Sequence, residues 1–495
     1  MLVPHDSLRG LARRALCVAL AASLAIHPVA AQLPELGDAS QSVLSPAKER
    51  SIGETAMREI RQYEPSYIDD AEVEYFLNRL GRRLVQATDA KPEDFLFFAL
   101  RDPTINAFAM PGGFIGVHSG LVLASQSESE LAGVLAHEIG HVQQHHIARM
   151  LDKQSGASAT MLAAFLLAIL AAGRGPSGSA MAQATLAGTQ AALIQNQLSY
   201  SQDFEREADR IGFQTLSASG FDVRGMANFF DRLGKAMRSS ERSETAYLRT
   251  HPLSVERMAD MQGRAQGAVP GVVADSNEYV LIRAKLDAEA GLPKDALARI
   301  QARQAPRRQD QAAKLYALAR AYTRDNRATE AQKALADLRA MRFESPLVDS
   351  MLADMLLRQG KAAEAEQVCG QAFARYSDAR FLLLCQVQAL TESGKPERAA
   401  QLARDALVDT PNDERLWILQ AKAYAAQGKV VEQQRAMAEL YVVRGNLIAA
   451  VEQLQLAQRG GGGDFYTQSA VDSRLRELRN RLREERREGR PNGLQ

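Results

Sequence analysis

A regular spacing of turn residues in the second half of this 495-residue chain limits its possible folds more than any other feature. The turn positions recur in steps of 35, 34, 34 and 34 residues, at Gly291, Asn326, Gly360, Gly394 and Gly428. Each of them is expected to lie in a turn between two helical runs. Five residues after each of the first four turn positions stands an alanine, and a small residue there lets paired helices pack closely. These alanines are Ala296, Ala331, Ala365 and Ala399. The pattern predicts an α-helical solenoid.

A helix-turn-helix period of 34 residues is typical of tetratricopeptide repeats. We predict that the repeat domain spans residues 275–460 and that residues 461–495 contain a flexible glycine-rich break and a charged C-terminal helix. The pattern of alanines lapses after the fifth turn, where Gln433 stands in place of a small residue. Cys369 and Cys385 lie inside the repeats and have two open interpretations. They either form a disulfide between neighbouring helices or are two small buried side chains.

The first half of the chain carries the motif His137-Glu138-Ile139-Gly140-His141. It lies in an apolar run that reads as one helix, which starts near Ser127 and is expected to extend as far as Leu151. Histidines four residues apart on a helix leave the same face about one turn apart, so both can donate to one zinc ion. The glutamate beside them can act as a general base. This pattern predicts a zinc peptidase, and the weaker alternative is a helix with solvated histidines.

A zinc ion with two histidine ligands needs a third protein donor. His145 and His146 extend the motif helix, but three ligands along one straight helix cannot close around a single ion, so we interpret both as structural or supporting residues. A later helical run contains Glu205, Glu207 and Asp209. Glu205 is the preferred third ligand, with Asp209 one turn further placed to accept a hydrogen bond from a ligand histidine. Glu207 is the rival.

His251 precedes Pro252 and is therefore expected in an extended or turn conformation that interrupts helical residues 221–265. It is either an exposed loop histidine or a side chain delivered to the zinc site. In the site it has two possible roles. It can hydrogen-bond the oxyanion of the tetrahedral intermediate, or it can bind zinc, displace the water and keep the protease latent. We favour the latent state.

Before the motif helix, residues 95–100 form a strand candidate, and two apolar runs surround Pro111-Gly112-Gly113. These runs predict a β-hairpin. The free edge of such a hairpin can pair with an extended substrate peptide, although the hairpin can also be purely structural. After the motif helix, residues 157–172 form an uncharged apolar run that is shorter than the ~20 residues needed to cross a bilayer. Burial against the site is the preferred interpretation, and contact with a membrane surface is the alternative.

The first 31 residues have arginines, an apolar run and then small residues, which is typical of a cleaved secretory signal peptide. The alternative is an uncleaved N-terminal anchor. Residues 32–45 are polar and predict a linker, and residues 46–270 are predicted to form the metallopeptidase domain. The formal net charge of +1 gives no reason to expect a nucleic-acid partner. Export to a periplasm follows if the host is a Gram-negative bacterium.

Taken together, these features resemble the BepA-type periplasmic zinc metalloproteases, which are related to HtpX and the CAAX prenyl proteases and carry tetratricopeptide repeats. The resemblance covers nearly the whole mature chain. It rests on the zinc motif, on Glu205-Arg206-Glu207-Ala208-Asp209, on Asn106-Ala107-Phe108 before the Pro-Gly-Gly turn, on His251-Pro252 and on the repeats.

The resemblance implies that His137, His141 and Glu205 bind one Zn²⁺ and that Glu138 is the general base. It also implies that Asn106 and Ala107 form the substrate-binding edge and that His251 faces the active site. The implied role is assembly and quality control of outer-membrane proteins, with unfolded or misassembled outer-membrane proteins, the β-barrel assembly machinery and lipopolysaccharide-transport proteins as partners.

The predicted fold is therefore mostly α, with a zincin-like α+β metallopeptidase domain that contains a small sheet, followed by an α-helical solenoid. The predicted function is that of an exported zinc endopeptidase that degrades misassembled clients recruited by the repeats. The rival function is that of a chaperone or assembly factor whose peptidase is latent most of the time.

Overall fold

The computed structural model describes residues 44–153, 201–239, 247–267, 273–461 and 464–488. The predicted signal peptide, most of the predicted linker and the apolar run 157–172 lie outside these residues. Within the described ranges, no helix combines the length and the apolar composition needed to cross a membrane.

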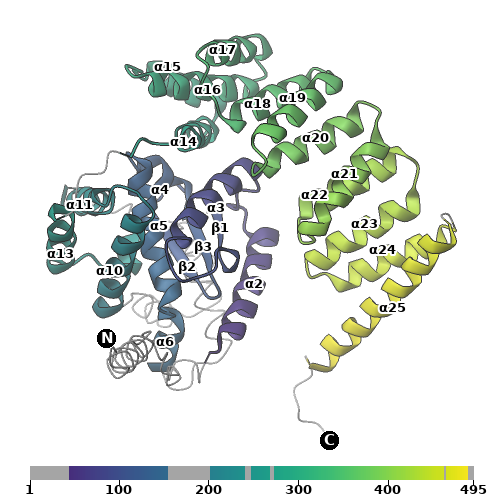
Figure 1. Cartoon of the computed structure of the whole chain (residues 1–495), viewed down its shortest axis with the longest axis horizontal. Coiled ribbons are helices and arrows are strands. Elements are labelled where there is room, and N and C mark those ends of the chain that lie inside the picture. Colours follow the sequence, from purple (N-terminus) through teal and green to yellow (C-terminus); the bar gives the residue numbers. More distant parts are fainter. Residues whose placement is uncertain (1–43, 154–200, 240–246, 268–272, 462–463, 489–495) are drawn as a thin grey trace, which may run out of the picture.

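The peptidase half is built from a three-stranded sheet and the helices around it (Figure 1). The sheet has the order β1-β3-β2, with β1 (Leu96–Leu100) parallel to β3 (Phe114–His118) and β2 (Ala107–Met110) antiparallel to β3. The strand candidate and the hairpin are thus confirmed, and β2 is an outer strand of the sheet. The helices are α2 (Pro46–Tyr63), α3 (Ala71–Val85), α4 (Ser119–Ala124), α5 (Glu128–Gln143), α6 (His146–Lys153), α10 (Gln202–Ala218), α11 (Arg224–Ser239), α12 (Tyr247–Thr250) and α13 (Val255–Gln266).

Both faces of the sheet are covered, which explains why its strands are apolar on both sides. Successive strand residues point to opposite faces. One face, which includes Phe97 and Val117, belongs to the large core shared with α3 and α5. The other, which includes Phe98 and Phe114, packs with residues of α2 and with Ile147 of α6. The sheet is thus enclosed between helices, with α5 on one side carrying the zinc motif.

The motif helix is shorter than the sequence predicts, which corrects the expectation that it extends to Leu151. Helix α5 ends at Gln143, and α6 begins at His146. Between them His145 has φ 47°, a left-handed conformation that the α-helix cannot contain. No glycine or proline marks this break, so the local sequence does not indicate it.

The second half consists of helical pairs that form an arc around the peptidase half (Figure 1). All five predicted turn residues have positive φ, between 58° and 78°, as is common directly after a helix end. The four alanines five residues later are at most 2% exposed, so the predicted close packing is confirmed. The helices are α14 (Asn277–Glu289), α15 (Pro293–Ala302), α16 (Arg308–Arg324), α17 (Ala328–Ala340), α18 (Pro346–Arg358), α19 (Ala362–Arg375), α20 (Arg380–Glu392), α21 (Pro396–Asp409), α22 (Glu414–Ala426), α23 (Val430–Val443), α24 (Leu447–Arg459) and α25 (Phe465–Glu488).

A disulfide joins Cys369 of α19 to Cys385 of α20. The structure therefore selects the first of the two interpretations for these cysteines. Helix α25 is the predicted charged C-terminal helix.

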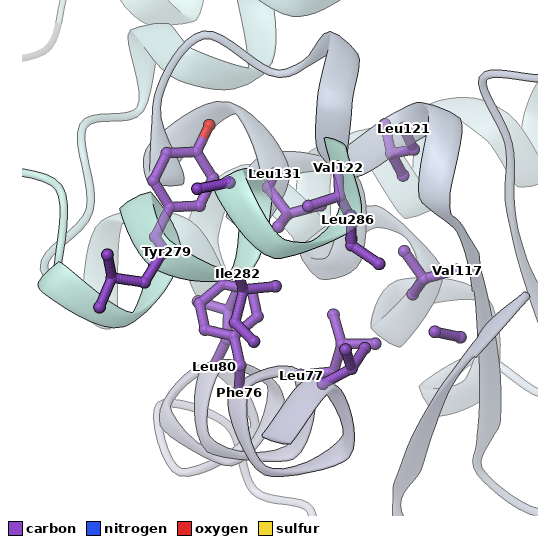
Figure 2. Packing of buried hydrophobic residues seen from close by; sticks show 14 of the residues in the cluster. Phe76, Leu77, Leu80, Val117, Leu121, Val122, Leu131, Tyr279, Ile282 and Leu286 are labelled. Carbon is purple, nitrogen blue, oxygen red and sulfur yellow. The ribbon is translucent and has the colours of Figure 1, made fainter. Parts of the chain in front are cut away.

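The first repeat helix packs into the core of the peptidase half. Figure 2 shows Ile282 of α14 beside Phe76 and Leu80 of α3, and Tyr279 and Leu286 of α14 belong to the same buried cluster. Beside this apolar contact, the buried Lys285 ammonium lies 2.6 Å from a carboxylate oxygen of Glu72 and 2.5 Å from one of Asp70. The limits 46–270 and 275–460 stay predictions, but these contacts indicate that the two halves depend on each other for stability.

We expect Tyr279→Ala to destabilise both halves. The Tyr279 ring is fully buried against Phe76, and its hydroxyl lies 2.9 Å from the Ser125 hydroxyl of the peptidase half. Removing a buried aromatic ring costs about 3–5 kcal/mol. Thermal unfolding of the full chain should show one transition at a lower temperature, whereas Tyr466→Ala, at an 81% exposed ring, should not shift it. Two transitions, with only one displaced, would contradict a shared core.

Candidate metal centre

The two motif histidines lie on the buried face of α5. Ser127 caps this helix by accepting a hydrogen bond from the Glu130 amide. His137 is 0% exposed and His141 is 2% exposed, and their Nε2 atoms are 3.0 Å apart. The i, i+4 spacing thus brings two imidazole nitrogens to one point inside the protein.

Glu205 of α10 reaches the same point. Its Oε2 lies 3.4 Å from Nε2 of His137, and its Oε1 lies 3.4 Å from Nε2 of His141. Donors held about 2.0–2.1 Å from a tetrahedral zinc ion are separated by about 3.3 Å, so these distances suit zinc. Glu207 faces away from this point and contacts His146 and Arg149 instead.

Close packing of α10 on α5 makes this reach possible. A Cβ atom on Gly212 would lie 2.9 Å from the backbone nitrogen of His137, and one on Gly140 would lie 3.1 Å from the carbonyl oxygen of Ala208. Both contacts involve backbone atoms, which cannot move without shifting a helix. The glycine inside the zinc motif therefore serves helix packing.

His251 joins the two histidines and Glu205. Its Nδ1 lies 3.0 Å from Oε1 of Glu205 and 3.4 Å from Nε2 of His137, and the donor atoms of all four residues lie within 4.8 Å of one another. The side chain is 1% exposed, so the alternative of an exposed loop histidine is wrong. The structure thus presents four donors, one more than a catalytic zinc site ordinarily takes from the protein.

Asp209 lies behind the first histidine, 3.0 Å from its Nδ1 atom. Arg257 of α13 holds this carboxylate with two hydrogen bonds of 2.7 and 2.8 Å, and it also lies 2.7 Å from Oε2 of Glu205. Burial alone raises the pKa of Asp209, but its bonds to Arg257 and His137 lower it below its usual range. Arg257 is not among the site residues predicted from the sequence, where its only signal is its place after the His251-Pro252 break.

The same carboxylates act on His137. Burial lowers the pKa of this imidazole, but the bonds to Asp209 and Glu205 outweigh burial and raise it to about 10. A divalent cation beside Glu205 supplies the positive charge that these carboxylates favour. The charge balance of the cluster therefore fits a bound metal ion.

Glu138 lies beside the donors and is fully buried. Its Oε1 accepts a hydrogen bond of 3.2 Å from the hydroxyl of Tyr247, while its Oε2 has no hydrogen-bond partner among the described residues. Burial, followed by the charge of Glu138, raises the pKa of Tyr247 well above its usual value, so the hydroxyl stays a donor. Tyr247 could not be predicted from the sequence, because its position four residues before His251 carries no recognisable signal.

The predicted substrate edge lies at the start of β2. Asn106 is 2% exposed and Ala107 is 0% exposed, and Oδ1 of Asn106 has no partner among the described residues. The carbonyl oxygen of Ile105, just before them, accepts a hydrogen bond of 3.2 Å from the Tyr247 amide. The first residue of α12 thus occupies the edge next to Asn106, and the substrate-binding role of these residues stays a prediction.

Comparison with known proteins agrees with this geometry. The model of peptidase family M48 matches residues 72–265, and that of the ChAPs (Chs5p-Arf1p-binding proteins) matches residues 317–440. The β-barrel assembly-enhancing protease of Escherichia coli strain K12 is 34% identical over 462 residues, which cover 90% of this chain and 91% of that protein. The chain belongs to the β-barrel assembly-enhancing protease family. As a member of this M48 family, it is a metalloendopeptidase with a helical repeat half.

Two further relatives show how far the likeness extends. A putative β-barrel assembly-enhancing protease of Vibrio cholerae is 40% identical over 291 residues, covering 57% of this chain and 58% of that protein. The metalloprotease LoiP of Escherichia coli is 28% identical over 221 residues, covering 45% of this chain and 82% of that protein. The family's catalytic metal has a fitting donor set here in the buried cluster of His137, His141, Glu205 and His251.

Proposed function

We propose that this member of the β-barrel assembly-enhancing protease family is a zinc endopeptidase that acts in the periplasm on misassembled outer-membrane proteins. His137, His141 and Glu205 hold one Zn²⁺ per chain. The observation that carries the proposal is the buried donor cluster, beside which Oε2 of Glu138 has no hydrogen-bond partner in the described part of the chain. A buried carboxylate oxygen without a hydrogen bond is costly, which favours a role in binding water at the site.

The side chains around the cluster have separate tasks in peptide cleavage. Zinc, when bound, polarises the scissile carbonyl and lowers the pKa of the attacking water toward about 7. Glu138 takes a proton from this water at Oε2 and passes it to the leaving nitrogen as the C–N bond breaks. Tyr247 holds Oε1 of the same carboxylate and thereby orients it, while Arg257 keeps Asp209 and Glu205 in place.

The cellular role rests on the likeness to named relatives and on the predicted signal peptide. The Escherichia coli relative, whose name states a role in β-barrel assembly, covers both halves of the chain. The repeats would bring clients to the peptidase, since solenoids offer extended binding surfaces. The β-barrel assembly machinery and lipopolysaccharide-transport proteins are the expected partners.

This role can be tested by comparing three strains, which contain the wild-type protein, the Glu138→Gln variant or neither. Misassembled outer-membrane proteins should accumulate in the last two strains and not in the first. Immunoblots of these clients after inhibition of protein synthesis give their lifetimes. Normal assembly with Glu138→Gln would instead favour the chaperone alternative, in which cleavage is dispensable.

We further propose that His251 is an inhibitory ligand in the resting enzyme. Its Nδ1 lies among the donors, and a fourth protein ligand leaves no room for substrate on zinc. Helix α12, which directly precedes His251, also covers the substrate edge through the hydrogen bond from the Tyr247 amide to the Ile105 carbonyl oxygen. A substrate strand that pairs at this edge would therefore have to displace the segment that holds the inhibitory histidine.

His251→Ala is expected to raise the resting cleavage of a flexible peptide several-fold, together with self-cleavage. The reason is that removal of the imidazole opens the fourth position on zinc. Peptide hydrolysis by the purified variant measures the effect, with His145→Ala as the matched control, because His145 contacts Glu49 of α2 and lies outside the donor cluster. A fall of about 10²–10³-fold would show that His251 instead stabilises the oxyanion.

A further inference from the structure

The break between α5 and α6 places a third histidine against the metal centre. Residues five apart on a continuous helix are separated by about 140° around its axis, so His146 would point away from His141. The left-handed His145 ends α5 and lets α6 start in a new direction. As a result, Nδ1 of His146 lies 2.8 Å from Nδ1 of His141.

A chain of polar contacts continues from this histidine toward the surface. Nε2 of His146 lies 3.1 Å from Oε2 of Glu207, and Nη1 of Arg149 donates to the same oxygen at 2.9 Å. His146 itself is fully buried, whereas the Glu207 side chain is 27% exposed. The chain thus leads from a buried ligand through a buried ring to a partly hydrated ion pair.

One arrangement of protons satisfies every contact in this chain. His141 presents Nε2 to the other donors, so this nitrogen must keep its lone pair and the ring hydrogen must be on Nδ1. That N–H donates to Nδ1 of His146, which then accepts and carries its own hydrogen on Nε2. The Nε2–H donates to Glu207, whose carboxylate only accepts.

We propose that His146 is a positioning residue for the metal centre, which fixes the tautomer and ring orientation of His141 by accepting its Nδ1 hydrogen. Glu207 and Arg149 fix His146 in turn. The inference rests on the proposed role of His141 as a zinc ligand. Under this proposal Glu207, the rival candidate for the third ligand, supports His146 behind His141 and does not bind the metal.

Helix α10 holds the His146 ring through two side chains, Phe204 and Glu207. The ring of Phe204 stacks on His146 with 4.4 Å between centroids and 14° between planes, which fixes the plane of the imidazole. The next residue along α10, Glu205, is the proposed ligand. The same turn of helix therefore places one donor at the metal and two supports, Phe204 and Glu207, behind another donor.

The two ligand histidines have supports of different charge. His137 is held by the carboxylate of Asp209 directly, and Arg257 binds that carboxylate. His141 is held by a neutral imidazole, and its carboxylate, Glu207, is one residue further away. Outer partners of ligand histidines contribute about 10–100-fold to metal affinity, and we expect an effect of this size from His146.

The test measures the zinc affinity of the full mature protein by competition with a chromophoric chelator. His146→Phe keeps a flat ring against Phe204 but cannot accept a hydrogen bond, so zinc affinity should fall about 10–100-fold. His146→Asn places a carbonyl oxygen close to the position of Nδ1 and should stay within a few-fold of the wild type. Glu54→Gln, at a half-exposed carboxylate of α2 outside the site, is the control and should bind zinc normally.

Glu207→Ala tests the same series of polar contacts, from His141 through His146 to Glu207, at a partly exposed position. It also covers the case in which His146→Phe fails to fold. It should weaken zinc binding several-fold. Wild-type affinity in the folded His146→Phe and Glu207→Ala variants would overturn the inference, and so would an equal loss in His146→Asn and His146→Phe. His141→Ala separates this from the proposed function, since retained zinc in that variant would refute the ligand assignment itself.

Discussion

Glu138→Gln is expected to lower peptide cleavage by about 10²–10⁴-fold while zinc content and thermal stability stay near those of the wild type. The carboxamide has the shape of the carboxylate and can still accept the hydrogen bond from Tyr247 on its oxygen. It cannot take a proton from water at pH 7. The loss should therefore appear in the rate of the chemical step. Cleavage of an unfolded protein substrate by purified protein, with metal analysis of the same sample, measures both quantities.

Glu54→Gln provides the control for loss of a carboxylate outside the site. Glu54 lies on α2 with its side chain 48% exposed, paired with Arg50. Its replacement should leave cleavage unchanged. Substantial cleavage by Glu138→Gln would remove this residue from the role of general base.

The second large effect concerns Glu205. Glu205→Gln is expected to release zinc on dialysis, because a neutral amide is a much poorer donor to a divalent ion and the buried Arg257 loses one of its carboxylate partners. Glu207→Gln should keep the metal, since an amide oxygen at that position can still accept the hydrogen of His146.

Metal content per chain after dialysis compares these two variants directly. They differ by two positions on one helix and remove the same charge. Loss of zinc from Glu207→Gln together with retention in Glu205→Gln would transfer the ligand role to Glu207.

The features that could be predicted from the sequence are those set by local geometry. Helical spacing alone places His137 and His141 on one face, and the turn residues of the repeats recur every 34 or 35 residues. Glu205 and Asp209 could be proposed because they lie one turn apart on a helical run. The structure places both next to the motif histidines, at 3.4 and 3.0 Å from His137.

Features set by tertiary packing could not be predicted in this way. Tyr247 and Arg257 act on Glu138 and Asp209 from helices more than forty residues away in the chain. The left-handed turn at His145 has no glycine, so nothing local shows that α5 ends there and that His146 returns toward the site. The sharing of a core between α14 and α3 depends on Tyr279 and Phe76, which are far apart in sequence.

The most direct test of the central claim is a zinc titration of the metal-stripped mature protein, with cleavage of an unfolded protein substrate and native mass recorded at each step. We expect the stripped protein to be inactive, cleavage to rise with added zinc, and both activity and bound metal to reach their maximum at one zinc per chain. Cleavage by the stripped protein at the rate of the untreated enzyme would contradict a metal centre formed by His137, His141 and Glu205.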